Sequence, residues 1–228
     1  MAKKKTVTKT VTARQLTIFP RGGAREGAGR KPNGAKPLVA HDTRPNLTRR
    51  DPVLITTRLV AGLPNLRRER TIALLRDKLA AGADRFGFRL VEYSIQTNHL
   101  HFVAEGEDAR SIARGMQGLL VRIAKALNKH WDRRGKVLVD RYHARILSTP
   151  REVRNALVYV LQNARKHGAQ LTGVDACSSG PWFQGWLDRI ARGASPIAAA
   201  RSWLLTQGWR RAGLISANET PKLRPAGP

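Results

Sequence analysis

Hydrophobic and polar positions from residue 51 onward predict four β-strands. Each segment is short, rich in β-branched or aromatic residues, and bounded by turn-forming residues. The predicted strands are 53–60, 88–95, 99–104 and 137–147. Only Gln96, Thr97 and Asn98 separate the second strand from the third, so these two are expected to form a hairpin.

Three further segments carry apolar residues at the spacing of an amphipathic helix. The first lies between residues 66 and 87, the second runs from Ala109 to about Trp131, and the third begins at Pro150 and ends at Gly168. The predicted buried stripes are Ile72, Leu75 and Leu79 in the first helix, Ile112, Met116, Leu119, Leu120, Ile123 and Leu127 in the second, and Val153, Leu157, Val160 and Ala164 in the third.

The order of these elements predicts an α+β fold of the ferredoxin-like, or split βαβ, type. It corresponds to a four-stranded antiparallel sheet with helices on one face, plus an extra C-terminal helix. This domain covers residues 51–168. Residues 1–50 are basic and without periodicity, which predicts a mostly disordered arm. Residues 169–228 form a C-terminal extension.

The two flanking regions each leave alternatives open. Tryptophans concentrate in the extension, where they are expected to pack it onto the domain, and base stacking is the alternative. In the arm, Gly29-Arg30-Lys31-Pro32 suits either non-specific phosphate contact or insertion into a DNA minor groove. The nearby glycines do not form a phosphate-binding loop, because no Gly-Lys-Ser/Thr follows them.

Charge points to a polyanionic partner. The 228 residues include 42 Lys and Arg against 16 Asp and Glu, a formal net charge of +26. No apolar run approaches the ~18 residues of a membrane span, and the N-terminus lacks the apolar stretch of a secretory signal, so a cytoplasmic protein without a membrane partner is expected. The single Cys177 excludes an internal disulfide and a multi-cysteine zinc site.

His99 and His101 flank Leu100 in the third predicted strand. Side chains alternate along a strand, so both imidazoles should project from the surface of the sheet while Leu100 enters the core. Two imidazoles in this arrangement can reach one cation. An exposed or hydrogen-bonded histidine pair is the alternative interpretation.

Tyr159 and Asn163 lie four residues apart in the third predicted helix. At 100° per residue, both fall beside the buried stripe and can face one site, while Gln162 falls on a more solvent-facing side. The alternative is a tyrosine at the core boundary with its hydroxyl in water, followed by a polar flank residue.

These motifs together resemble a known family. His99-Leu100-His101 before a long helix, Tyr142-His143 on a following strand, and Tyr159-x-x-x-Asn163 after it are similar to single-tyrosine HUH transposases. The resemblance is greatest to the REP-associated tyrosine transposases of the insertion-sequence-200-like superfamily, and it covers roughly residues 51–168. Many members have proline after the helix asparagine, where this chain has Ala164.

The resemblance implies an endonuclease that cuts and rejoins single-stranded DNA, often beside a hairpin. It implies Tyr159 as the nucleophile and His99, His101 and Asn163 as ligands of a divalent cation, Mg²⁺ or Mn²⁺. The cation would polarise a non-bridging phosphate oxygen, and the product would be a 5′-phosphotyrosine with a free 3′-hydroxyl. The adduct retains the bond energy, so no nucleotide cofactor is expected. The family includes monomers and dimers, which leaves the oligomeric state open.

Other residues compete for these roles or support them. Tyr142 is an alternative nucleophile, although a sheet-packing role is simpler, and His143 is expected either at the surface or beside a phosphate. The outer face of the second helix is expected to bind DNA phosphates in a salt-dependent way; its residues are Arg110, Arg114, Arg122, Lys125 and Lys129. A second set near the site is expected to grip the cut strand or hairpin: Arg141, Arg145, Arg165 and Lys166.

Three functions are therefore compatible with the sequence. The first is a transposase-like, metal-dependent enzyme for DNA cleavage and strand transfer, as in DNA transposition or recombination, that associates with the nucleoid when it binds DNA. The second is a non-catalytic DNA- or RNA-binding protein, which has no need of His99, His101 and Tyr159 together. The third is a hydrolytic metal nuclease that uses the histidines without covalent attachment to a tyrosine.

Overall fold

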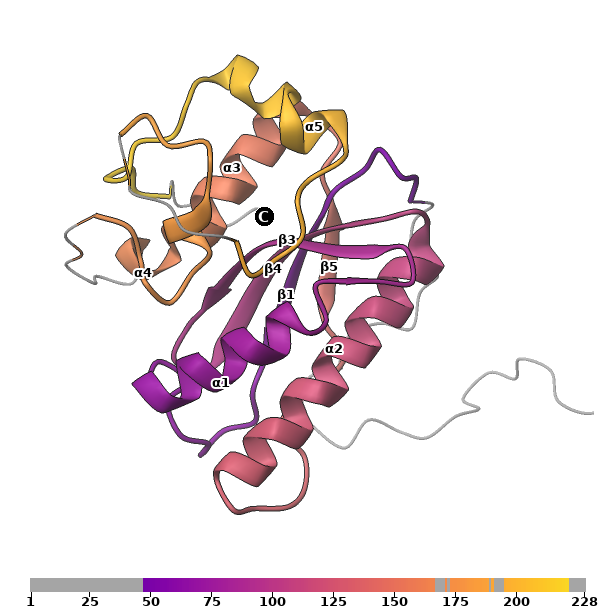
Figure 1. Cartoon of the computed structure of the whole chain (residues 1–228), viewed down its shortest axis with the longest axis vertical. Helices are drawn as coiled ribbons and strands as arrows, with labels where there is room; N and C mark the ends of the chain where they lie inside the picture. The colour runs from indigo at the N-terminus through magenta and orange to yellow at the C-terminus, as the bar shows by residue number, and fades with distance from the viewer. Residues whose placement is uncertain (1–46, 167–170, 172, 189, 191–194, 222–228) are drawn as a thin grey trace, which may run out of the picture. The chain divides into compact units, whose positions relative to one another are not determined.

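A five-stranded antiparallel sheet forms the centre of the part of the chain that the structure describes (Figure 1). The computed structural model describes residues 47–166, 171, 173–188, 190 and 195–221. The chain divides into two units, Met1–Leu38 and Val39–Pro228, and all described residues belong to the second. The predicted arm therefore lies outside the described residues except for 47–50, as does Gly168, the predicted end of the third helix.

The predicted strands and helices are present, together with short strands and helices that were not predicted. The strands are β1 (Val53–Arg58), β2 (Asp84–Arg85), β3 (Phe88–Ile95), β4 (His99–Gly106) and β5 (His143–Ile146). The helices are α1 (Glu69–Ala80), α2 (Ala109–His130), α3 (Pro150–Leu161), α4 (Asn163–Lys166) and α5 (Trp203–Thr206). Two 3₁₀ turns follow in the extension, η1 (Gly180–Trp182) and η2 (Gly208–Ala212).

The strand order β2-β3-β4-β1-β5 contains the predicted arrangement. Without the two-residue β2, the order β3-β4-β1-β5 is that of a split βαβ fold, which confirms the α+β class. The predicted strand 137–147 is shorter than expected. Its first part contributes only an isolated bridge between Leu138 and Leu59, and the ladder with β1 resumes at His143.

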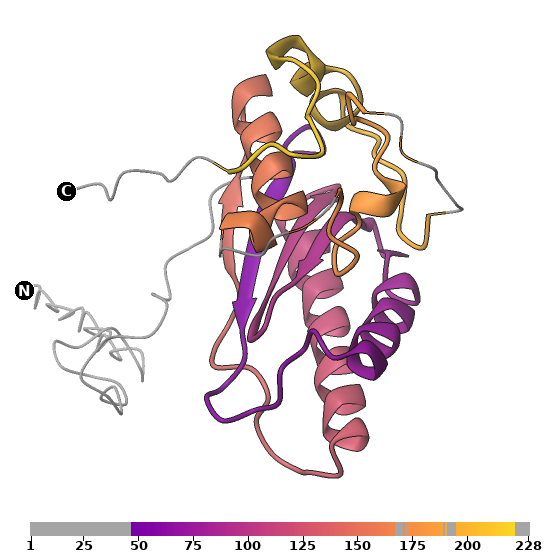
Figure 2. The ribbon, with the colours of Figure 1, turned by 90° about the vertical axis from the view of Figure 1, so that its left-hand side faces the viewer.

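Each face of the sheet carries its own hydrophobic cluster. Leu100 and Phe102 of β4 pack with residues of α1 and α2, and we call this group the α2-side cluster. Val103, which points the other way, packs with Val153 and Leu157 of α3 in the α3-side cluster. Figures 1 and 2 show α1 and α2 on one face of the sheet and α3 on the other. The helix that carries Tyr159 therefore covers the second face.

The two long helices follow the predicted patterns closely. All six predicted apolar positions of α2 are buried, and at Gly115 the helix approaches β3 so closely that a Cβ atom would overlap the ring of Phe88. α3 begins with Pro150 and a capping box between Thr149 and Glu152. It ends at Leu161, because Gln162 leaves the helical conformation (φ −115°, ψ 18°), and α4 resumes the turn at Asn163.

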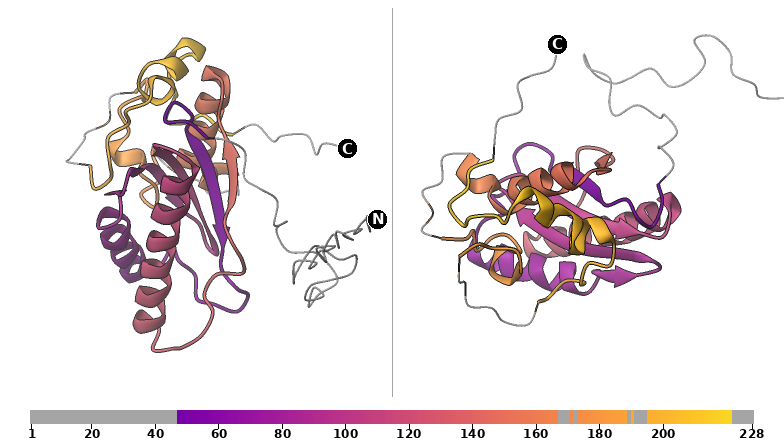
Figure 3. Two further views of the ribbon diagram at one scale, coloured as in Figure 1. Left: turned by 90° about the vertical axis from the view of Figure 1, so that its right-hand side faces the viewer. Right: turned by 90° about the horizontal axis from the view of Figure 1, so that it is seen from above.

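The described parts of the extension pack onto this domain (Figure 3). Residues 177–179 hydrogen bond to the backbone of β3, and Trp186 and Trp209 are buried in the α3-side cluster. Packing, the expected role of the extension's tryptophans, is confirmed for these two. Arg67 binds Asp175 through two 2.8 Å hydrogen bonds, and Arg154 binds Glu219 in the same way. Among the described helices, none combines the length and apolar character needed to span a membrane.

Candidate functional site

His99 and His101 lie at the start of β4 and project from the face that α3 covers. Residues directly opposite in an antiparallel sheet share a face, so the register shows what lies beside them. His101 has one neighbour on each side in the sheet: Thr56 of β1 lies opposite it on one side, and Ser94 of β3 lies opposite it on the other. Thr56 also lies opposite His143 of β5. His143, Thr56, His101 and Ser94 therefore form a polar row across four strands.

The environment of His101 differs from the sequence expectation. The two histidines were expected on the sheet surface, but His101 is only 2% exposed because α3 covers it, while His99 is half-buried. Nδ1 of His101 lies 2.9 Å from the hydroxyl of Thr56. A neutral His101 whose Nδ1–H donates to Thr56 keeps the lone pair of Nε2 available for a proton or a cation.

Tyr159 reaches this lone pair from α3. Its phenol oxygen lies 3.4 Å from Nε2 of His101, and the centroids of the two rings are 4.9 Å apart. The rings of His99 and His101 are 4.7 Å apart and nearly perpendicular, at 81°. Tyr159 of α3 thus meets His101 of β4, and the ring of His99 lies next to that of His101.

Lys166 adds a positive charge to the same place. Its ammonium nitrogen lies 4.9 Å from the centroid of the Tyr159 ring, in a cation–π contact. A cation beside the phenol suits a site that receives a phosphate anion. Of the basic residues predicted near the site, Lys166 is thus placed against Tyr159 itself.

Asn163 differs from its predicted setting on the flank of a continuous helix. The break at Gln162 means that counting 100° per residue from Tyr159 does not place Asn163. Its side chain is fully buried, and neither amide atom has a hydrogen-bond partner among the described residues. Gln162, expected to face solvent, is buried because the extension covers it: its amide nitrogen donates to the carbonyl of Ala217 at 2.6 Å.

Tyr142 and His143, which compete for roles at the site, lie on opposite faces of the sheet. Tyr142 is buried in the α2-side cluster, on the opposite face of the sheet from His101. Its position agrees with the simpler expectation of a packing role. His143 is exposed and shares the face of His101, with Thr56 between them.

A buried carboxyl group lies further along the same face. Glu92 lies opposite Val103 in the register, and the hydroxyl of Ser179 hydrogen bonds to it. Burial raises the pKa of Glu92 to about 8, with Ser179 opposing the shift. Glu92 faces this way because Val91 forms a bulge in β3, which shifts the alternation between Leu90 and Glu92.

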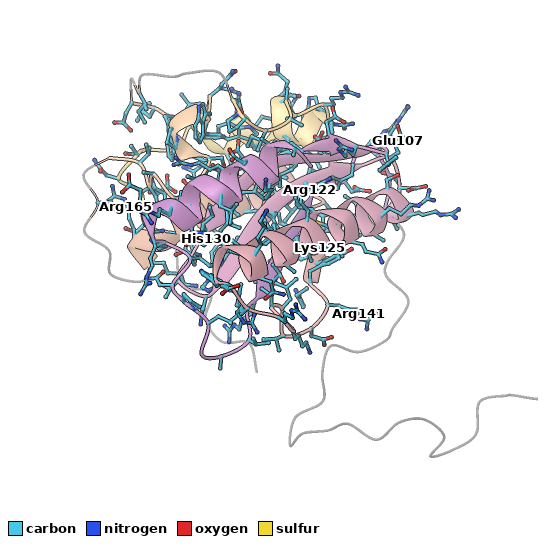
Figure 4. All side chains as sticks on the ribbon, turned by 60° about the horizontal axis from the view of Figure 1, so that its bottom comes forward. Glu107, Arg122, Lys125, His130, Arg141 and Arg165 are labelled. Carbon is cyan, nitrogen blue, oxygen red and sulfur yellow. The ribbon has the colours of Figure 1, made fainter. Side chains whose placement is uncertain are left out.

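The predicted phosphate-binding face of α2 lies on the other side of the sheet from Tyr159. Arg110, Arg114, Lys125 and Lys129 are exposed and Arg122 is half-buried. Figure 4 looks onto α1 and α2 and labels Arg122 and Lys125. Together with Lys78 of α1, three of these residues line a shallow groove of about 530 Å³ between the helices. This face and the Tyr159 site are separated by the sheet.

The other predicted DNA-binding residues differ in the contacts that they make within the protein. Arg145 forms an ion pair with Glu152 at 2.9 Å. Arg165 hydrogen bonds to the carbonyl of Gly173 and the side chain of Asn218, so it holds the extension against α4. Arg141 is exposed (Figure 4).

Sequence reasoning missed Thr56 and Glu92 as neighbours of the site. Both belong to strands that pair with β4, and a local sequence pattern does not determine the register of that pairing. The signal for Glu92 is a charged residue within an apolar strand, which indicates a buried carboxyl group. Among the described residues no group of three or more His, Cys, Asp or Glu side chains could hold a metal ion, so a cation here would need the two histidines and an amide or substrate oxygen.

Comparisons with known proteins give a distant structural similarity. No family model matches the sequence, and no curated protein matches it. One solved structure, of a REP-associated tyrosine transposase bound to a REP hairpin, is similar with a TM-score of 0.49 and 14% sequence identity. The match covers 62% of this chain and 82% of that one. At this TM-score and identity, the similarity assigns no activity and no residue role to the present chain.

Proposed function

We propose that this protein cleaves and rejoins single-stranded DNA through a covalent bond between the DNA and Tyr159. The observation that carries the proposal is the position of the phenol oxygen, 3.4 Å from Nε2 of His101, whose ring in turn lies 4.7 Å from the ring of His99. A protein that only binds nucleic acid has no need to place a phenol against a buried imidazole. The net charge of +26 favours a polyanionic substrate.

In the proposed reaction the phenol oxygen of Tyr159 forms a bond to phosphorus as the bond from phosphorus to the 3′ oxygen breaks. The phenol loses its proton and the departing 3′ oxygen gains one, so the products are a 5′-phosphotyrosine and a 3′-hydroxyl. Attack by another 3′-hydroxyl reverses the step and joins two strands. The phosphoester energy is retained throughout, and no nucleotide is consumed. Lys166, whose ammonium lies over the Tyr159 ring, would hold a phosphate oxygen in this reaction.

A divalent cation is part of the proposal, and the kinds of donor atom that these residues carry would suit one. His99 and His101 supply imidazole nitrogens, and Asn163 supplies a buried amide that has no hydrogen-bond partner among the described residues. Such a group is costly to bury unless it finds a partner, and a cation provides one for its oxygen. Two imidazoles suit Mn²⁺ better than Mg²⁺, which prefers oxygen ligands. When bound, the cation would polarise the phosphate that Tyr159 attacks.

His101 cannot hold a cation and accept the phenol proton through the same nitrogen. A His101 that holds a cation and a His101 that accepts the phenol proton predict different results when metal is removed. With a bound cation, EDTA should abolish covalent attachment. Attachment at an unchanged rate in EDTA would leave His101 as the proton acceptor and remove the cation from the proposal.

The test of the function is covalent attachment to labelled hairpin oligonucleotides with single-stranded flanks, in Mn²⁺, on a denaturing gel. The full chain should give a slowly migrating protein–DNA adduct, and Tyr159→Phe should lose it by more than 100-fold, because phenylalanine has no nucleophilic oxygen. Tyr142→Phe is the matched control, since it removes a hydroxyl on the opposite face of the sheet. Cleavage without an adduct would indicate a hydrolytic nuclease, and binding alone a non-catalytic protein.

A further inference from the structure

We propose that the exposed indole of Trp203, together with the guanidinium of Arg211 that lies over its ring, is a stacking site for an unpaired base of single-stranded DNA. The inference takes its ligand class from the proposed function. Trp203 differs from the other tryptophans of the extension in its exposure. Trp186 and Trp209 are at most 4% exposed, whereas Trp203 remains 49% exposed at the surface.

The surroundings of Trp203 fit a nucleic-acid strand. The guanidinium of Arg211 lies 4.9 Å from the indole centroid, and Arg201 and Arg210 are exposed nearby in the sequence. Among the described residues, neither Arg210 nor Arg211 forms an ion pair with a carboxylate. Bases stack on indole rings and on guanidinium planes alike, and positive charges suit the phosphates between the bases.

The indole is held in place by its own segment. Gly208 lies against the ring, where a Cβ atom would come within 2.7 Å of it. Residue 208 therefore has no room for a larger side chain unless the indole moves. Ser202 caps α5 by accepting a hydrogen bond from the amide of Leu205. A fixed aromatic surface loses little conformational entropy when a base stacks on it.

The segment is also tied to the strand that carries the histidines. The buried carboxylate of Glu105 accepts hydrogen bonds from the amides of Arg201 and Ser202, at 2.9 and 2.7 Å, and pairs with Arg89. Glu105 follows His101 by four residues on the same face of β4, which corresponds to roughly 14 Å along the strand. About four nucleotides of a stacked strand, at ~3.4 Å each, span that length. A strand held at Tyr159 would need about this number of nucleotides to pass over the covering elements and reach Trp203.

The test measures binding without chemistry, in a Tyr159→Phe background, by fluorescence anisotropy with labelled hairpins. One hairpin has a single-stranded flank with bases, and the other has the same flank with abasic sites. Trp203→Ala should weaken binding of the first about 5- to 100-fold, the range for loss of one base stack, and leave the second unchanged. Trp203→Phe should retain most of the affinity. Leu187→Ala, which removes another exposed apolar side chain of the extension, is the control.

Several results would overturn the inference. An equal loss with the abasic flank would mean that Trp203 acts on phosphate contact or on folding rather than on bases. Equal effects of Trp203→Ala and Leu187→Ala would remove any special role of the indole. Self-association that Trp203→Ala abolishes, with binding unchanged, would make the patch a protein interface. A different result would contradict the proposed function, namely the absence of a Tyr159-dependent adduct, so the two proposals can fail independently.

Discussion

At the scale of single residues, a hydrogen bond to His101 and the burial of Glu92 characterise the face of the sheet that α3 covers. Thr56 matters because its hydroxyl lies 2.9 Å from Nδ1 of His101 and so orients the imidazole, with Nε2 toward Tyr159. Glu92 matters because it is buried on the same face, where a charged carboxylate is costly. With a pKa of about 8, Glu92 carries its proton at neutral pH.

Glu92 should make the stability of the protein depend on pH. In the unfolded chain the carboxyl ionises near its ordinary pKa of 4.5, whereas in the folded protein it holds its proton until about pH 8. Unfolding therefore releases a proton between these values, and the free energy of unfolding should fall as pH rises through this window. The slope contributed by this one group is about 1.4 kcal/mol per pH unit at most.

Urea denaturation between pH 5 and pH 9 measures this effect. Glu92→Gln should gain stability relative to the natural protein as pH rises, and the difference should level off above pH 8. Glu107→Gln is the matched control, since Glu107 is exposed (Figure 4) and should change little. Parallel pH profiles for the natural protein and Glu92→Gln would show that Glu92 ionises normally in the folded state.

At the scale of elements, the extension acts as the outer layer of α3. η2 packs on α3, Trp209 fills the α3-side cluster, and Arg154 of α3 binds the carbonyls of Gly213 and Leu214. The covered helix ends at Leu161, where Gln162 hydrogen bonds to Ala217 instead of facing water. The extension thus fixes the end of the helix that carries Tyr159.

Two tryptophans should differ strongly in their effect on stability. Trp209→Ala removes a side chain that is 1% exposed and should lower the free energy of unfolding by about 3–5 kcal/mol. Trp203→Ala, at an exposed position, should cost about 1 kcal/mol or less. Urea denaturation followed by circular dichroism measures both. Similar costs for the two changes would show that the extension does not pack on α3 in this way.

At the scale of the whole domain, the sheet separates two positively charged regions. Lys166 and Tyr159 lie on the α3 side, and the basic face of α2 lies on the other. In the proposed function, a short single strand held at Tyr159 would not run along α2. The face of α2 is therefore suited to a different part of a longer or hairpin DNA.

Neutralising the basic face of α2 should change binding without changing the reaction. The triple change of Arg114, Lys125 and Lys129 to Gln should weaken DNA affinity and reduce the slope of log affinity against log salt by about 0.7–0.9 per lost phosphate contact. The adduct rate at saturating DNA should stay the same, while Lys166→Met should lower that rate. Salt titrations and single-turnover assays measure the two quantities. A lowered rate in the α2 variant would place that face at the reacting strand.

The sequence by itself determined the class of fold and the face of β4 on which His99 and His101 lie. Periodicity is a local property, so strands, helices and the buried stripes of α2 and α3 follow from it. Strand alternation also placed His99 and His101 on one side of β4 and Leu100 on the other. The roles of Tyr159, Asn163 and a cation came from resemblance and stay proposals.

Only the tertiary structure decided how deeply the site is buried and what surrounds it. The register of β1 and β3 against β4 placed Thr56 and Ser94 beside His101, and a bulge at Val91 turned Glu92 to the same face. Packing of the extension buried Gln162, and the break after Leu161 placed Asn163 and Lys166. These features depend on contacts between residues far apart in the chain, which no local pattern of hydrophobic and polar positions specifies.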